Sequence, residues 1–532
     1  MRGDSKYKLL KSRYYNNILD KLTKLFIKHN YKVWNKFNNQ EKILDGEILF
    51  ELNAMHSTAI SSSYLANVLS KKYQSKLVGY YLVKPSWRQL YGFLRRSFEK
   101  VYESFGMSKI VYTKLNKVLQ NESNILYKKV YTSLREKKDV ENITIDRILI
   151  GDLVYDSFLR SASKPTIDIK DKYFINLLKN SLDIYTFWKN YFNTHNVKAI
   201  SVSHCVYNWA IPLRIAISKN IPAFQCSSEY VYRLNRKNMF AYTDFVGIKE
   251  VFSKFPDAVQ EKALKQAKNR IELRLKGEVG VDMSYSSKSA YTNNRLNRLI
   301  KASSRKKVFI ALHCFFDSPH SYGSNLFPDF FEWLDFLGKI SEKTNYDWYL
   351  KTHADYLPGN MPIINYFLKK YTRFNLLPSN SSHYQIIEEG IDVALTTYGT
   401  IGFEYAALGV PVINASLNNP HIAYNFILHP RSVKEYSEIL HNLDKINLKI
   451  DKNEVYEYYF MSKIHRSNKW LFNDHDHMLE DLGGYSEQFT SKIYGYWMER
   501  FTIFRHDKTI KALSEFIDSE DFIMSTKFLE KD

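Results

Sequence analysis

Hydroxyl, glycine and carboxylate groups come together in one short stretch of the sequence, TTYGTIGFE from Thr396 to Glu404. The apolar segments 392–397 and 410–413 predict two strands, and residues 401–408 have helical spacing. The turn from Thr396 to Thr400 therefore begins a helix, where unpaired N–H groups and the helix dipole suit a phosphate. One turn later, Glu404 can accept hydrogen bonds from sugar hydroxyls. An ordinary βαβ unit capped by threonines gives the same pattern, so both interpretations stay open.

The pattern T-x-Y-G-T-x-x-x-E-x-A-x-x-G-x-P-V-I over residues 396–413 resembles the donor-binding segment of GT-B glycosyltransferases. The resemblance is strongest to bacterial enzymes of capsule and lipopolysaccharide biosynthesis. In that group the turn lies beside the phosphates of the nucleotide sugar, and the glutamate contacts a sugar or ribose. The resemblance assigns those roles to Tyr398, Gly399, Thr400 and Glu404, and it leaves the donor open.

A second block, K-T-H at residues 351–353, comes at the end of the predicted strand 347–352. It is similar to the K-x-H-P block of the same enzymes, with alanine where proline is usual. The resemblance implies that Lys351 and His353 approach the donor phosphate, where positive charge stabilises a leaving nucleotide. Ser379 precedes a predicted helix at 384–389 and would add a polar contact beside the nucleotide.

The long loop at residues 313–328 carries Asp317 and His320. It follows strand 307–312, the first predicted strand of the second half of the chain. GT-B enzymes often close over the donor at this point, so the resemblance places both side chains in the cleft.

In the first half of the chain, polar side chains follow three predicted strands. His56 comes after strand 47–52, His204 after strand 198–203, and Glu229 after strand 222–227. Ligands of Rossmann-type sheets bind beyond the carboxyl ends of the strands, so we expect these side chains to face a cleft. His56 could be a general base or an acceptor contact, although a lone histidine is more often structural.

The segment RILIGDLVYDSFLR, residues 147–160, predicts a short strand followed by a helix. Asp156 and Arg160 are four residues apart on one helical face, where they can form a surface ion pair. Alternatively, Asp156 deprotonates an acceptor hydroxyl. The segment resembles the G-D-L-x-Y-D-x-x-L-R block of bacterial surface-polysaccharide biosynthesis proteins, which favours a functional role for both residues.

The chain carries a formal net charge of +20 over 532 residues. Such a charge attracts nucleic acid, an anionic membrane surface, or an acidic or lipid-linked glycan. The sequence has no zinc-finger spacing, RNP box or helix-turn-helix pattern, so we expect no nucleic-acid partner. A solvated basic surface without a partner is the simpler alternative.

Three cysteines without C-x-x-C spacing argue against a disulfide framework or a structural zinc site. The N-terminal residues lack the apolar core of a signal peptide. We therefore expect a cytoplasmic protein, with peripheral contact to the inner face of the cell membrane as an alternative.

The order of predicted elements indicates an α/β protein of GT-B architecture, with two Rossmann-like domains facing a central cleft and extra helices at both termini. Residues 1–250 form the acceptor-side domain with basic helical insertions, and residues 251–305 form a helix and linker. Residues 306–450 form the nucleotide-sugar-binding domain. Residues 451–532 form helices that pack back on the first domain.

The resemblance implies a glycosyltransferase that moves a sugar from a nucleotide-sugar donor to a growing capsule or lipopolysaccharide acceptor. The enzyme would be of hexosyl, Kdo or sialyl type, without cofactor or obligatory metal. Alternatives are a polyol-phosphate transferase, a sugar-nucleotide epimerase of the same fold, and a non-enzymatic polyanion-binding protein. The sequence leaves the sugar, the linkage and the oligomeric state open.

Overall fold

The computed structural model describes residues 19–38, 45–82, 98–240, 245, 247–279, 281–282, 289–291, 295–352, 359–465, 470–472, 475–525 and 528. Within these ranges, none of the helices combines the length and the apolar character that crossing a bilayer requires.

A six-stranded sheet organises the first half of the chain, with strand order β3-β2-β1-β6-β7-β8. Neighbouring strands are parallel except for β7 and β8, which are antiparallel. The bounds are β1 Glu47–Glu51, β2 Lys76–Tyr81, β3 Lys109–Tyr112, β6 Val197–Val202, β7 Ala223–Cys226 and β8 Val231–Leu234. The outward order of β1, β2 and β3, with later strands on the other side of β1, is that of a Rossmann-like domain.

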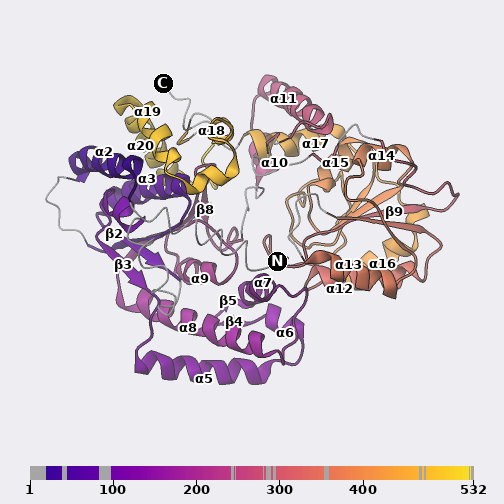
Figure 1. The fold of residues 1–532 in the computed structure, drawn as a ribbon, viewed down its shortest axis with the longest axis horizontal. Coiled ribbons are helices and arrows are strands. Elements are labelled where there is room, and N and C mark those ends of the chain that lie inside the picture. Colours follow the sequence, from indigo (N-terminus) through magenta and orange to yellow (C-terminus); the bar gives the residue numbers. More distant parts are fainter. Residues whose placement is uncertain are drawn as a thin grey trace.

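Helices cover both faces of this sheet (Figure 1). They are α2 Lys21–Asn38, α3 His56–Tyr73, α5 Lys117–Ser133, α6 Lys137–Glu141, α7 Gly151–Ala162, α8 Lys172–Thr194 and α9 Ile211–Ser218, with a hairpin of β4 Thr144–Ile145 and β5 Ile148–Leu149. Side chains of α7, α8 and α9 form one core on the sheet, and α3 belongs to the core on the opposite face.

Helix α3 is buried although serines occupy much of it. The hydroxyls of Ser61 and Ser62 donate to the carbonyl of Thr58 at 3.0 and 2.8 Å, and Ser63 donates to Ala59 at 2.7 Å. These bonds to the preceding turn satisfy the hydroxyls within the helix itself. The helix can therefore lie in an apolar environment without unpaired serine side chains.

The second sheet has five parallel strands in the order β11-β10-β9-β12-β13. The strands are β9 Lys307–Ala311, β10 Asp347–Lys351, β11 Phe374–Leu376, β12 Val393–Thr396 and β13 Val412–Asn414. The helices are α10 Ile248–Phe252, α11 Asp257–Leu275, α12 Phe330–Ser341, α13 Asn360–Lys370, α14 His383–Glu388, α15 Ile401–Ala407, α16 Val433–His441 and α17 Lys452–Tyr459.

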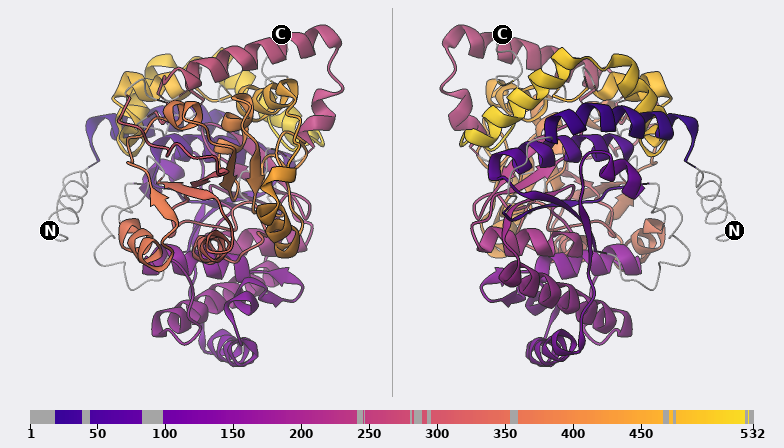
Figure 2. Two further views of the ribbon diagram at one scale, coloured as in Figure 1. Left: turned by 90° about the vertical axis from the view of Figure 1, so that its right-hand side faces the viewer. Right: turned by 90° about the vertical axis from the view of Figure 1, so that its left-hand side faces the viewer.

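After α17 the chain returns to the first sheet. Helices α18 His475–Leu482, α19 Lys492–Arg500 and α20 Ile503–Asp518 follow. Their apolar side chains share a core with those of β1 and α3. Figure 2 shows these helices, in yellow, beside the N-terminal helices, in indigo, although the whole second sheet lies between them in the sequence. The C-terminal helices are thus structural parts of the first domain.

Two Rossmann-like sheets with their helices, facing one another, confirm the predicted α/β class of GT-B architecture. The sequence analysis assigned no strand to residues 109–112, which form the edge strand β3. A strand of four residues at the sheet edge gives a periodic signal too short to stand out between helices.

Candidate active site

A cavity of about 1000 Å³ lies between the two domains and is lined by side chains of both. The first domain contributes residues of α7 and of the loop after β6. The second domain contributes the carboxyl ends of β9, β10 and β12, together with residues of α11. The cavity therefore lies at the edge of the sheet where ligands of α/β proteins bind.

Of the predicted site residues, eight line this cavity: Arg160, His204, Asp317, Lys351, Tyr398, Gly399, Thr400 and Glu404.

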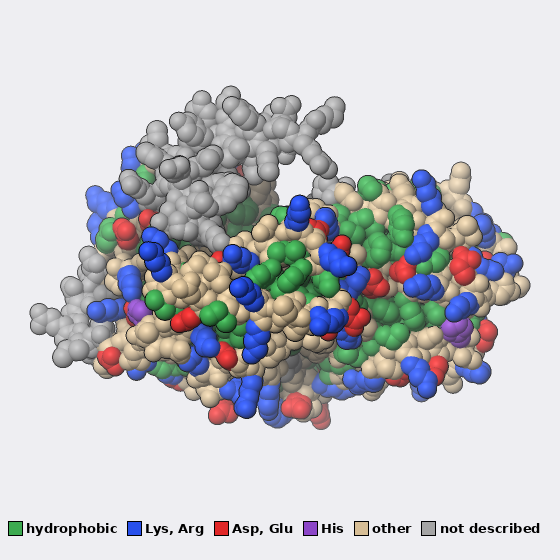
Figure 3. All heavy atoms as spheres, turned by 90° about the horizontal axis from the view of Figure 1, so that it is seen from below, with side chains coloured by type: hydrophobic (Ala, Val, Ile, Leu, Met, Phe, Trp, Pro, Cys, Tyr) green, Lys and Arg blue, Asp and Glu red, His purple; other side chains and the backbone are tan. Residues whose placement is uncertain are grey.

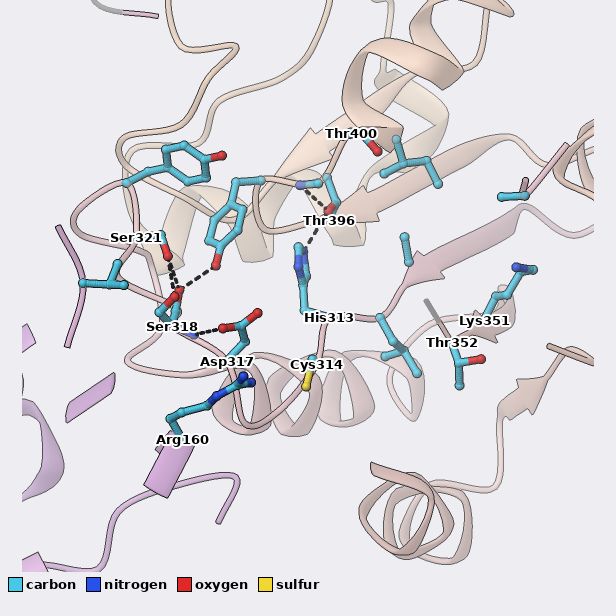
Figure 4. A pocket seen from close by; sticks show the side chains of 18 of the residues that line it. Arg160, His313, Cys314, Asp317, Ser318, Ser321, Lys351, Thr352, Thr396 and Thr400 are labelled. Atoms are coloured by element: carbon cyan, nitrogen blue, oxygen red, sulfur yellow. Dashed lines mark hydrogen bonds between the residues drawn. The ribbon is translucent and has the colours of Figure 1, made fainter. Parts of the chain in front are cut away.

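The cation at the end of β10, Lys351, is only 3% exposed. Burial alone lowers the pKa of its ammonium group to about 8, because among the described residues no carboxylate pairs with it. The neighbouring Thr352 has a buried hydroxyl that makes no hydrogen bond within the described part of the chain. Both residues line the cavity, so neighbouring residues at its wall carry an ammonium group and a hydroxyl that have no partner among the described residues (Figure 4).

The turn after β12 is held in place by His313. The N–H of Thr397 donates to Nε2 of His313 at 3.2 Å, and the hydroxyl of Thr396 lies 3.1 Å from the same nitrogen. The N–H of Gly399 donates to the Thr396 hydroxyl at 3.0 Å. A Cβ atom at Gly399 would lie 2.9 Å from that hydroxyl oxygen, so a larger residue would displace the turn. The sequence noted His313 only as the start of a loop.

The carboxylate of Glu404 lines the cavity and is fixed by two partners. Arg274 of α11 donates from Nε to Oε1 at 2.7 Å, and the hydroxyl of Tyr291 donates to Oε2 at 3.1 Å. Sequence reasoning missed both partners, because Arg274 is one of many basic residues on its helix and Tyr291 lies in the predicted linker. A terminal nitrogen of the Arg274 guanidinium also lies 2.6 Å from Oε1, and the carboxylate keeps a further acceptor position with which Glu404 can bind a ligand hydroxyl.

The wall on the other side of the cavity carries His204, Asp317 and Arg160. Burial lowers the pKa of His204, while the charge of Asp317 acts in the opposite direction. Asp317 accepts hydrogen bonds from the Tyr207 hydroxyl at 3.0 Å and the Ser318 N–H at 2.9 Å. Figure 4 shows Arg160 next to Asp317. His204 is therefore a neutral imidazole at neutral pH, with a carboxylate close to it.

Asp156 and His320 do not line the cavity; they lie against each other in the interface between the two domains. Asp156 is 1% exposed and lies 2.6 Å from Nδ1 of His320, while Nε2 of His320 lies 3.4 Å from Glu141. The predicted pairing of Asp156 with Arg160 is absent, because Asp156 faces the domain interface and Arg160 is exposed. Asp156 therefore joins the two domains and does not line the cavity.

Four other predicted residues are not brought to the cavity or cannot be located. The ring of His56 packs between Phe98 and Tyr494, at centroid distances of 5.3 and 4.5 Å. Glu229 lies 3.3 Å from His475, and Ser379 is exposed and outside the cavity lining. His353 lies outside the described residues, and its predicted contact with a donor phosphate stays a prediction.

No protein-family model and no curated protein sequence matches the chain. Similar solved structures include KpsC of Thermosulfurimonas dismutans, a β-Kdo 2,7 transferase, at 16% identity over 49% of this chain and 75% of that chain, with TM-score 0.29. HepE of Anabaena, solved with UDP and glucose, is 9% identical over 85% and 98% of the two chains, with TM-score 0.24.

A UDP-GlcNAc 2-epimerase of Neisseria meningitidis, solved with UDP-GlcNAc, is 10% identical over 78% of this chain and 98% of that chain, with TM-score 0.21. Because these TM-scores are low, the GT-B class of this chain rests on the strand order of its two sheets and on the cavity between them.

Proposed function

We propose that this protein is a glycosyltransferase that moves a sugar from a nucleotide-sugar donor to a bacterial surface polysaccharide or its lipid-linked precursor. The observation that carries the proposal is Lys351, a buried cation without a carboxylate partner among the described residues, at the wall of the interdomain cavity. Burying an unpaired charge destabilises a protein, so its presence in a cavity is best explained by an anionic ligand. The phosphates of a nucleotide sugar have the required charge.

The donor would lie along the second domain. Lys351 and the hydroxyl of Thr352 contact its phosphates at the end of β10, and the turn of Gly399 and Thr400 borders the same space. Glu404, fixed by Arg274, accepts hydrogen bonds from hydroxyls of the ribose or the sugar. Positive charge from these side chains neutralises the leaving phosphate, so the proposed reaction needs no obligatory metal.

The acceptor would enter from the side of His204 and Asp317. In an inverting transfer, the acceptor oxygen forms a bond to the anomeric carbon of the sugar while the bond from that carbon to the phosphate oxygen breaks. The proton of the acceptor hydroxyl goes to His204, which is neutral because burial lowers its pKa. The nearby Asp317 then stabilises the imidazolium. The nucleotide leaves with the bonding electrons as a phosphate anion beside Lys351.

Acceptor chemistry follows from the first-domain wall, where Arg160 and Trp209 line the cavity and Trp209 is 46% exposed. An exposed indole face and a guanidinium in one cavity wall suit a sugar ring that bears a negatively charged group. This supports an acidic glycan or a lipid-linked phosphate as the acceptor.

The test is a thermal-shift titration with UDP, GDP, CDP, CMP and ADP, because a ligand that binds only the native state raises its melting temperature. We expect one nucleotide to stabilise the wild type and to lose most of its effect in Lys351→Met. The matched control is Lys343→Met, since Lys343 is exposed just before the opposite, amino-terminal end of β10.

Turnover assays separate the alternatives. Consumption of the nucleotide sugar without an acceptor would indicate an epimerase and overturn the proposal. Stabilisation by an acidic polymer and by none of the nucleotides would favour a non-enzymatic polyanion-binding protein. Transfer that requires an acceptor and is lost in His204→Ala supports both the reaction and its base.

A further inference from the structure

Helix α2 has a basic outer face. Its inner side chains Phe26 and Trp34 are 0% and 2% exposed and belong to the core of the first domain. Lysines on the solvent side, Lys24, Lys28 and Lys32, are exposed, and the helix contains no acidic residue. One face of α2 packs, while Lys24, Lys28 and Lys32 on the other face form no ion pair with the described residues.

Two large apolar side chains protrude next to this face. Ile503 and Phe504 begin helix α20 and are 61% and 74% exposed. The hydroxyl of Thr502 accepts from the N–H of Arg505 at 3.2 Å, which fixes the start of the helix. Both side chains are adjacent in sequence at a defined helix end. Exposing these two apolar side chains to water costs free energy, and contact with another apolar surface would remove that cost.

The basic face and the apolar pair are neighbours in space. The ring of Phe501, two residues before Ile503, contacts that of His29 on α2 at a centroid distance of 4.5 Å. The charge of Lys32 acts on the same His29 and lowers the pKa of its ring further, after burial. Helices α2 and α19 also pack through Phe26 and Tyr494, whose stacked rings are 4.3 Å apart. Figures 1 and 2 show α2, α19 and α20 together at one edge of the molecule.

We propose that this surface, Lys24, Lys28, Lys32, Ile503 and Phe504, docks the protein on an anionic lipid bilayer. Lysines are attracted to acidic headgroups, and a protruding Ile–Phe pair can insert between the headgroups and the upper acyl chains. A soluble polyanion would use the lysines and leave the apolar pair in water, so the pair favours a membrane. The surface is separate from the cavity lining, so docking and nucleotide binding can fail independently.

A second exposed apolar pair provides a matched control. Val118 and Ile125 on α5 are 64% and 70% exposed. Helix α5 lies at the lower edge of the molecule in Figure 1, the side that faces the viewer in Figure 3, whereas α2 and α20 lie near the upper edge in Figure 1. Val118 and Ile125 are two helical turns apart, and Glu122 lies between them in the sequence. The control side chains therefore have exposed fractions similar to those of Ile503 and Phe504. They differ in that they are not adjacent in sequence and lie on a helix that is not purely basic.

The experiment is co-sedimentation of the full chain with vesicles of equimolar phosphatidylglycerol and phosphatidylcholine, compared with phosphatidylcholine alone. We expect binding to the anionic vesicles only. Ile503→Ser with Phe504→Ser, and separately Lys24, Lys28 and Lys32→Gln, should each weaken binding at least about tenfold. Val118→Ser with Ile125→Ser should bind like the wild type. A thermal melt of each variant checks its fold. The same melt with the nucleotide that stabilises the wild type in the thermal-shift titration checks its cavity.

A fluorescence measurement on a folded single variant gives a second readout. In Phe504→Trp, transfer of the new indole into the bilayer should shift its emission to shorter wavelength when anionic vesicles are added, measured after subtraction of the wild-type spectrum from the eight native tryptophans. Equal binding to neutral vesicles, unchanged binding of the Ile503 and Phe504 double variant, or an indole that stays in water would each overturn the proposal. If only the lysine variant weakened vesicle binding, the surface would be one that binds polyanions through charge, and insertion into the bilayer would be overturned.

Discussion

At the scale of single residues, the buried position of Lys351 lowers the stability of the folded protein but favours the binding of an anionic ligand. Its ammonium group is buried, and its pKa is lowered to about 8 by burial. Its ordinary pKa of 10.5 is kept in the unfolded chain. Below pH 8 the folded protein therefore carries the full cost of a buried charge, and this cost falls as the pH rises from 8 towards 10.5.

Replacing this lysine should stabilise the free protein. In Lys351→Met the apolar part of the side chain stays and the charge is removed, so we expect the free energy of unfolding at pH 7 to rise by roughly 1–3 kcal/mol. Urea unfolding measures the change, with Lys343→Met as the control. A variant less stable than the wild type would show that the ammonium group has a partner that holds the fold together.

The same residue predicts the pH dependence of nucleotide binding. A phosphate binds the charged form of Lys351, and the free protein loses that proton as the pH rises through about 8. Affinity for the nucleotide should therefore fall above pH 8, by up to about tenfold per pH unit. Calorimetric titration between pH 7 and pH 9.5 tests this. In Lys351→Met, nucleotide affinity should no longer fall with pH above pH 8. An equal fall in the variant would show that another group titrates.

At the scale of elements, the loop from His313 to Asp329 is bound to the first domain by buried polar contacts. His320 lies between Asp156 and Glu141, and the hydroxyl of Tyr155 donates to Asp329 at 2.5 Å. Burial alone would lower the pKa of His320, but attraction to Asp156 and Glu141 outweighs it and raises the pKa to about 10. The loop that borders the cavity is thus positioned by residues of the opposite domain.

Removing one partner of the cluster of His320, Asp156 and Glu141 should lower the stability of the folded protein. Asp156→Asn leaves the charge of His320 buried with weaker compensation, so we expect a loss of roughly 3–5 kcal/mol in the free energy of unfolding. The control is Glu438→Gln, which removes a carboxylate 3.9 Å from Lys434 on the exposed surface of α16 and should change stability by less than about 0.5 kcal/mol. Equal effects of the two variants would mean that the interdomain cluster contributes little.

The raised pKa of His320 sets the sign of the pH effect. The stabilisation by its charged form is fully present below pH 6.5, the ordinary value for histidine, and it is lost as the pH rises through about 10. The difference in stability between wild type and His320→Gln should shrink over this range, which urea unfolding at several pH values measures. A difference that grows with pH would contradict the ion cluster.

At the scale of the whole molecule, the C-terminal helices complete the first domain. Phe516 of α20 is 0% exposed, and its ring lies 6.3 Å from that of Phe224 on β7. Although α20 follows the second domain in sequence, its apolar side chains cover the first sheet. The two domains are therefore linked both by the linker before β9 and by this return of the chain.

Phe516→Ala should destabilise the first domain by roughly 3–5 kcal/mol, because it leaves a cavity in that core. Hydrogen exchange should lose protection in β1, α3 and β7 and keep it in β9, β10 and β12. The matched control on the same helix is Phe504→Ala, since Phe504 is 74% exposed and its removal opens no cavity. Loss of protection in the second sheet instead would show that α20 supports the other domain.

The sequence by itself determined most strands of the two large sheets and the residues at the ends of those strands. Apolar runs and turn residues are local signals, so Lys351 at the end of β10, the turn from Thr396 to Thr400 and His204 after β6 could be placed at strand ends, where the cavity lies. The same runs predicted two α/β halves, because alternating strands and helices fold into parallel sheets, and the resemblance of residues 396–413 to GT-B enzymes added the GT-B class.

Only the tertiary structure decided which of these strand ends share one cavity. His56 and His204 both follow parallel strands of one sheet, but Tyr494 of α19 packs on His56, while His204 stays at the cavity wall. Arg274 reaches Glu404 over a separation of 130 residues, and His320 meets Asp156 over 164. Such contacts depend on how helices pack and on how domains face each other, and periodicity along the chain carries no information about either.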